Sequence, residues 1–228
     1  EIDIDSYFTD KTISTDETDW SPEWPGSLIQ YNLLDLIDLN LSVNAKKFTV
    51  FDTSIENSKF IAEIKGGDLS VGPFTGELFK GKLNATFFAS REEIPKINLF
   101  LSIKDADITD APTIPFTISP TTGALELILD INAEGESIRE LVSSINGELD
   151  IKLEEGNLVG LNLSNLFQDI LDLKNITGFS EVLEQSFADH ETKYSEIHSV
   201  SLINDGVLNL DTFNAVLSGA SILAQGNL

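Results

Sequence analysis

The chain offers two imidazoles for catalysis or metal binding. His190 and His198 flank the stretch HETKYSEIH, and the chain has no cysteine. A zinc site needs further nitrogen or thiolate ligands at a short, fixed spacing, and none accompany these two residues. We therefore expect both histidines on the surface, and no metal site.

Carboxylates gather at three places: Asp3 with Asp5, residues 16–19, and Glu154 with Glu155. None of them has the spacing of an EF-hand, and each is typical of a solvated face. No two of the 38 acidic residues stand out as the acid and base of a glycosidase. Nucleophile-elbow, phosphate-loop and dinucleotide motifs are absent. The sequence predicts a noncatalytic protein without a cofactor.

Composition excludes several partners. The 228 residues carry a net charge of -24, which repels nucleic acid and opposes docking on anionic lipid head groups. A hydrophobic content of 41% argues against disorder. No apolar run reaches about 18 residues, so no transmembrane helix is expected. The opening EIDIDSYF resembles no signal peptide, and we expect a fragment whose targeting segment lies elsewhere.

The positions of glycine indicate where the strands that carry these residues begin and end. After residue 30, the triplet Gly-x-Leu begins at eight of the 14 glycines: Gly67, Gly76, Gly81, Gly123, Gly147, Gly156, Gly206 and Gly226. Glycine supplies the positive φ of a tight turn, and the leucine would be the first inward residue of the next strand. We predict a hairpin turn at each triplet.

Between these turns the hydrophobic period is two, which predicts antiparallel strands with one apolar face. They are expected at residues 1–10, 39–45, 48–51, 59–65, 68–71, 77–89, 96–104, 124–132, 145–154, 157–159, 196–203, 207–210, 213–218 and 221–228. Three segments have helical spacing instead: one after Ser137, one after Ser164, and a short one from Ser180 to Phe187.

The predicted class is therefore mainly β: an antiparallel meander curved into a groove or a sandwich, with two or three short helices capping one end. We divide the chain into an initial strand with an acidic linker (1–27), an N-terminal β region (28–118) and a C-terminal β region with helices (119–228), together one continuous sheet. Trp20 and Trp24 lie in the linker, where we expect them to pin it to the domain.

The order of these elements resembles a known family. GALELILDINAEG leads into a capped helix in ESIRELVSSI, and NGELDIKLEEGNLVGLNLSNLF leads from a hairpin into a second helix. TKYSEIHSVSLINDGVLNLDTFNAVLSGASILAQGNL then closes the chain. This order is similar to the C-terminal region of the AsmA family of bacterial envelope proteins. IDIDSYF and the strand units of the first half resemble its N-terminal part.

The resemblance implies a periplasmic domain of a protein anchored in the bacterial inner membrane and linked to outer-membrane assembly. Related proteins of the TamB and chorein types form apolar β-grooves thought to carry phospholipids between membranes. Membrane association would then come through a segment absent from this chain, and other envelope proteins would be partners.

A sheet with one apolar face must cover that face or leave a trough. The predicted helices are too few to cover it, so a closed sandwich and an open trough both remain. In a trough the lipid-facing residues would be Leu39, Leu41, Val43, Phe60, Ile97, Leu99, Leu101, Leu125, Leu127 and Leu129. The alternatives are a structural or adhesive β-domain that acts through protein partners, and a calcium-dependent envelope module.

Overall fold

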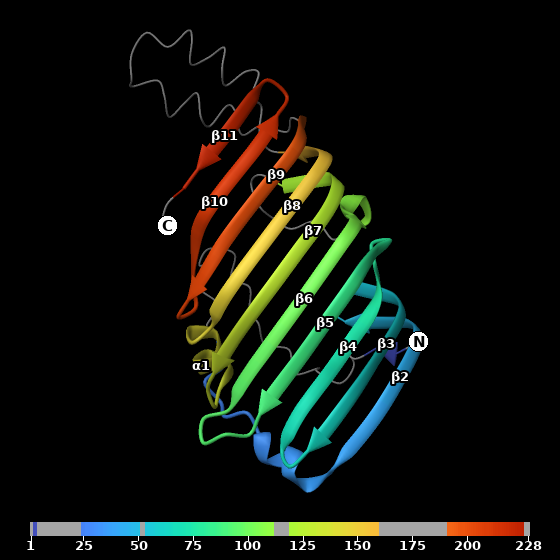
Figure 1. The fold of residues 1–228 in the computed structure, drawn as a ribbon, viewed down its shortest axis with the longest axis vertical. Coiled ribbons are helices and arrows are strands. Elements are labelled where there is room, and N and C mark those ends of the chain that lie inside the picture. The colour runs from blue at the N-terminus through green and yellow to red at the C-terminus, as the bar shows by residue number, and fades with distance from the viewer. Residues whose placement is uncertain (1, 4–23, 51–52, 112–118, 160–190, 226–228) are drawn as a thin grey trace.

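The computed structural model describes residues 2–3, 24–50, 53–111, 119–159 and 191–225 (Figure 1). Ten strands form one antiparallel sheet that does not close on itself, and β1 adds a short parallel pairing at one edge. The strands are β1 (Ile2–Asp3), β2 (Leu39–Val50), β3 (Thr53–Lys65), β4 (Asp68–Leu78), β5 (Gly81–Ser90), β6 (Lys96–Asp107), β7 (Ser119–Glu134), β8 (Asn146–Val159), β9 (Glu191–Asn204), β10 (Val207–Leu217) and β11 (Ala220–Ala224). Their order across the sheet is their order in the chain.

The predicted mainly β, antiparallel meander is confirmed. Two hairpin turns match the predicted glycine chemistry: residues 66–67 and 205–206 all have positive φ, with 88° at Gly67 and 75° at Gly206. This geometry suits the twist of the flanking strands. The β4–β5 turn instead uses Phe79 and Lys80, with φ of 48° and 66°. Neither residue signals a turn. The triplet at Gly81 predicted a turn here, whereas the predicted strand 77–89, which ran across it, is wrong.

For four triplets the predicted turn is wrong, because Gly76, Gly123, Gly147 and Gly156 lie inside β4, β7 and β8. Three predicted strand breaks are wrong as well: β2, β8 and β10 are each a single strand. Lys46 and Lys47 are both exposed, Glu155 has a φ of 53°, and a register shift falls between Leu210 and Thr212. Such irregularities interrupt the alternation without ending a strand.

Of the predicted helices, the one after Ser137 is confirmed as α1 (Ile138–Ser143). The Ser137 hydroxyl accepts from the Glu140 amide at 3.2 Å, and the Glu140 carboxylate accepts from the Glu136 amide at 2.7 Å. These bonds cap the first turn. The two later predicted helices lie outside the described residues. Two short 3-10 helices were not expected: η2 (Tyr31–Leu36) and η3 (Ile108–Asp110).

The two ends of the strands differ in what they carry. The lower end in Figure 1 consists of residues 24–39, 63–68, 91–96, 134–146 and 203–208, and includes η2 and α1. The upper end consists of the turns at 79–80 and 218–219, η3, and the adjoining ends of the strands. β6 and β7, on either side of residue 118, pair along most of their length, so the N-terminal and C-terminal regions share the sheet.

Both buried clusters lie toward the upper end. One contains Ile108, Leu153, Leu158, Tyr194, Ala215 and Leu217. The other contains Ile55, Leu83, Ile103 and Ala106. Ile55 belongs to β3 but packs with residues of β6, three strands away, so the sheet curls over itself here. Gly76 permits this, because a Cβ at that position would lie 2.6 Å from the Ile55 side chain.

Candidate functional site

The register places all ten predicted lipid-facing residues on one face of the sheet. Directly paired residues of an antiparallel ladder point to the same side. Leu39, Leu41 and Val43 pair with Ile64, Ala62 and Phe60. The ladders then continue through Leu69 and Val71 to Ala89 and Phe87, and on to Ile97 and Leu99. We call this side the apolar face.

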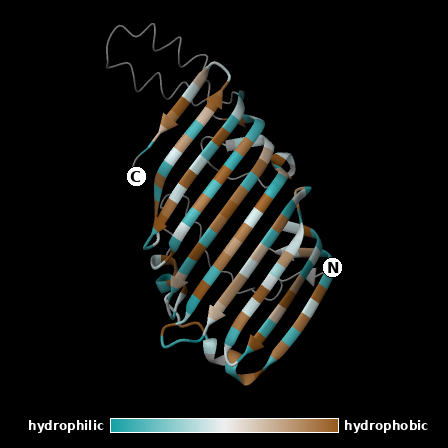
Figure 2. Cartoon of the chain, in the orientation of Figure 1, coloured by the Kyte–Doolittle hydropathy of each residue, from teal (hydrophilic) through white to brown (hydrophobic). Residues whose placement is uncertain are grey.

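Rows of aliphatic and aromatic side chains cross this face from strand to strand. One row contains Val71, Phe87, Leu99 and Ile131; the next contains Ala85, Leu101, Leu129 and Leu149; a third contains Leu83, Ile103, Leu127 and Ile151. Leu125 pairs with Ala106 and Leu153 in a fourth row. Figure 2 shows the resulting alternation of hydrophobic and hydrophilic residues along the strands. The apolar face is therefore continuous across β2–β8.

Burial on this face varies along the strands: Ala89 and Ala133 near the lower end are 4% and 5% exposed, whereas Leu99 and Leu129 in the middle are only partly buried. Ala106 is 0% exposed, whereas Leu39 and Leu41 are 39% and 45% exposed. In the described parts of the chain, α1 and η2 lie at the lower end and η3 at the upper end, so no described helix crosses the middle of the face. The middle of the apolar face and its β2 edge are therefore available to an apolar ligand.

Three phenylalanines line the N-terminal side of the apolar face. The rings of Phe60 and Phe74 stack with centroids 5.3 Å apart, and Phe48 meets both edge-on at 5.9 and 5.8 Å. These arrangements suit the quadrupoles of aromatic rings. Of the three, only Phe60 was predicted as lipid-facing. The cluster packs β2, β3 and β4 together through one aromatic residue from each strand.

The opposite face, which we call the polar face, is mainly polar, although Phe88, Phe100 and Ile128 are exposed on it. Lys152 forms ion pairs with Glu154 at 2.6 Å and Glu196 at 3.7 Å, and His198 Nε2 lies 2.8 Å from an Asp150 oxygen. Both the imidazole and the carboxylate are more than a third exposed. The predicted surface position of His198 is confirmed; His190 lies outside the described residues. No group of three or more potential ligands that could hold a metal occurs in the described part of the chain.

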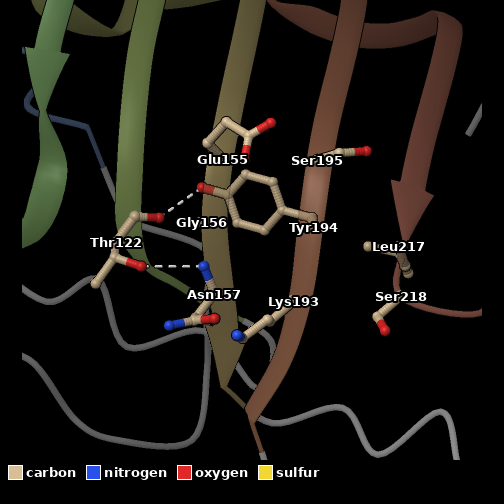
Figure 3. A pocket seen from close by; sticks show the side chains of 9 residues that line it. All are labelled: Thr122, Glu155, Gly156, Asn157, Lys193, Tyr194, Ser195, Leu217 and Ser218. Atoms are coloured by element: carbon tan, nitrogen blue, oxygen red, sulfur yellow. Dashed lines mark hydrogen bonds between the residues drawn. The ribbon is translucent and has the colours of Figure 1, made fainter.

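A pocket of about 470 Å³ lies at the upper end around Tyr194 (Figure 3). The Tyr194 hydroxyl donates to the Thr122 carbonyl at 2.6 Å, and the Thr122 hydroxyl accepts from the Asn157 amide at 3.0 Å. The ring passes over Gly156, where a Cβ would collide with it and with the Thr122 carbonyl. Glycine in β8 thus makes room for the tyrosine.

Burial raises the pKa of Tyr194 to about 12. The phenol therefore stays protonated near neutral pH and serves as a hydrogen-bond donor. A base or nucleophile would need a pKa much closer to neutral. The residues around the upper pocket accordingly have a structural role, since their hydrogen bonds join β7, β8 and β9.

A second apolar feature lies at the lower end and was not predicted. Nine of the 17 exposed large hydrophobic side chains in the described residues are here: Trp24, Leu28, Leu36, Ile37, Leu39, Ile94, Ile138, Val207 and Leu208. We call them the apolar rim. Trp24 is 42% exposed, and its carbonyl accepts from Arg139; Trp20 lies outside the described residues. Irregular segments have no hydrophobic period, so the sequence carried no signal for the rim.

Comparison with known proteins bears on the family. Within the described residues, no helix has the length and hydropathy needed to cross a membrane. Neither a curated protein nor a solved structure matches the chain. The model of the AsmA family, however, matches residues 10–213, which is well over half of the 228 residues. The chain therefore belongs to the AsmA family.

Proposed function

We propose that this chain is a noncatalytic periplasmic domain that binds phospholipid acyl chains along its apolar face. Its parent protein would be anchored in the inner membrane, and the domain would pass lipid between membranes or support outer-membrane assembly. Family membership is consistent with such a role in the envelope. The geometry of the apolar face supports acyl-chain binding by this chain.

The observation that carries the proposal is the set of apolar rows across the sheet, whose middle no helix of the described residues crosses. Leu99, Leu129 and their neighbours are only partly buried, although each lies in the middle of the sheet. Apolar surface of this extent gains free energy when it leaves water, about 25 cal/mol per Å². An acyl chain offers the matching chemistry, because it needs no hydrogen-bond partner and can follow a row of leucines.

The first test is native mass spectrometry of the protein purified from a bacterial host, followed by lipid analysis after denaturation. We expect phospholipid to co-purify, and delipidated protein to bind a hydrophobic dye in its native state. A clean protein mass, together with no binding of added phospholipid, would contradict the proposal and favour action through protein partners.

Two matched double variants locate the lipid. Leu99→Gln with Leu129→Gln places amides on the apolar face, whereas Phe100→Gln with Ile128→Gln changes adjacent residues of β6 and β7 that point to the polar face. We expect the first variant to lose at least tenfold in bound phospholipid, and the second to keep it. Circular dichroism and thermal unfolding establish that both remain folded. Equal lipid loss in the two variants would remove the apolar face as the site.

A further inference from the structure

We propose that the apolar rim at the lower end is a docking surface for a protein partner that presents a cationic, amphipathic segment. The inference is independent of acyl-chain binding. It rests on the exposure of the rim, on the way the rim is held in place, and on the charges around it.

Exposure is greatest in the segment that precedes β2. The side chains of Leu28 and Leu36 are 68% and 74% exposed, and Ile37 is 51% exposed. Scattered surface leucines are ordinary, but a concentration of large apolar side chains at one end marks an interaction site. The core of the domain does not use these residues, because both buried clusters lie toward the other end.

The segment is nevertheless held firmly. The Ile29 amide donates to the Glu136 carbonyl at 2.7 Å, the Arg139 amide donates to the Pro25 carbonyl at 3.1 Å, and Leu28 forms a bridge with Ser137. An ion pair between Asp35 and Arg91 ties η2 to the β5–β6 loop. The rim is thus presented in one arrangement before any partner arrives, which reduces the ordering entropy of binding.

The net negative charge of the lower end limits which kinds of partner can bind the rim. Its segments hold ten acidic residues against four basic ones, Lys65, Arg91, Lys96 and Arg139. Of these four, Arg91 is paired with Asp35, Lys96 with Glu92, and Arg139 with the Trp24 carbonyl. Glu93, Glu136 and Asp205 have no side-chain partner among the described residues. The rim is therefore apolar within a negative field.

Complementarity then favours a basic partner. A second copy of this chain would bring two acidic ends together, and a bilayer with anionic lipids would be repelled. An amphipathic helix with Lys or Arg beside its apolar stripe satisfies both the apolar side chains and the carboxylates. We assign the rim to such a protein segment.

The test uses an 18-residue helical Leu/Lys peptide as the probe and a Leu/Glu peptide of the same pattern as its control. We expect the domain to bind the first, to ignore the second, and to bind more weakly as NaCl is raised. The variant Leu28→Ser/Leu36→Ser/Ile37→Ser should lose at least tenfold in affinity. The variant Ile128→Ser/Ile222→Ser/Leu223→Ser, which removes as many exposed apolar side chains away from the rim, should bind as the unchanged protein does.

Several results would overturn the assignment. Equal binding of the Leu/Lys peptide by the two triple variants would show attraction to the overall charge alone. Rim-dependent flotation with phosphatidylethanolamine vesicles would make a bilayer the occupant, and rim-dependent dimerisation in sedimentation would make it a second copy. The rim variant should keep its co-purifying phospholipid, and the Leu99/Leu129 variant should keep the peptide, so the two proposals fail separately.

Discussion

The two ends of the sheet use similar residues in opposite ways. At the upper end Leu153, Leu158 and Leu217 are buried in a cluster that η3 closes with Ile108. At the lower end Leu28 and Leu36 are exposed although backbone hydrogen bonds and an ion pair hold their segment. The buried leucines of the upper end therefore stabilise the fold, whereas the exposed leucines of the lower end contribute little to folding. This difference separates the part that holds the fold from the part available for recognition.

The largest effect should come from leucine truncations at the two ends. Leu153→Ala leaves a cavity in the upper cluster and should cost about 3 kcal/mol of unfolding free energy. Leu36→Ala removes an exposed side chain and should change it by less than about 0.5 kcal/mol. Urea denaturation measures both. Similar costs would erase the distinction between a packed end and an exposed one.

The second effect concerns glycine. Gly156→Ala places a methyl group against the Thr122 carbonyl and the Tyr194 ring, and should destabilise the fold by about 2 kcal/mol. Gly26→Ala at the lower end would meet the Arg139 guanidinium at an ordinary 3.5 Å, so it serves as the control with little change. Thermal unfolding of the pair measures the difference. A stable Gly156→Ala protein would mean that Tyr194 can move aside.

Tyr194→Phe should have a smaller effect of about 1 kcal/mol, because it removes one hydrogen bond of 2.6 Å. The folded pKa of this phenol is raised to about 12. Its contribution is therefore complete below about pH 10, the pKa of an unfolded tyrosine, and is lost as the pH rises through 12.

Urea midpoints at pH 8 and pH 11.5 check both statements. The unchanged protein should lose more stability over this interval than Tyr194→Phe does. Tyr31→Phe is the lower-end control, since its hydroxyl lies 3.4 Å from the Gly135 carbonyl and makes a weaker bond. Identical alkaline losses in all three proteins would exclude Tyr194 as their source.

The smallest effect should come from the polar face, between the two ends. His198→Gln removes the 2.8 Å contact between the imidazole and Asp150, whose groups are both more than a third exposed. We expect a change within about 0.5 kcal/mol, smaller still in 1 M NaCl, where exposed charges are screened. Urea denaturation at low and high salt measures it. A salt-independent loss above 1 kcal/mol would instead assign a packing role to the imidazole.

Period-two alternation predicted the meander and the shared face of residues from Leu39 to Leu129, because side chains of paired strands must fall on the same side. The same alternation also places Ile131 and Leu149 on this face, although they were not named as lipid-facing; they pair with Leu99 and Leu129. The alternation could not foresee the irregularities at Lys46–Lys47, Glu155 and Asp211, which shift the pattern by one residue while the strand continues.

The features that the sequence did not predict depend on tertiary contacts. Gly76 and Gly156 read as turn residues, but each lies under a large side chain from elsewhere, Ile55 or Tyr194. No local pattern reports such an approach. The rim escaped prediction for a similar reason, since residues 24–38 acquire their position from α1 and Arg91 and not from their own spacing.

The unbroken order of the strands has a further consequence, for growth of the domain. Each of β2–β11 pairs only with its neighbours in the chain, so the sheet behaves as a one-dimensional array. An inserted hairpin adds two strands, or about 10 Å of width, and restores both strand direction and the face on which the leucines lie. Gene duplication within such a chain can lengthen the apolar face while the connectivity stays the same.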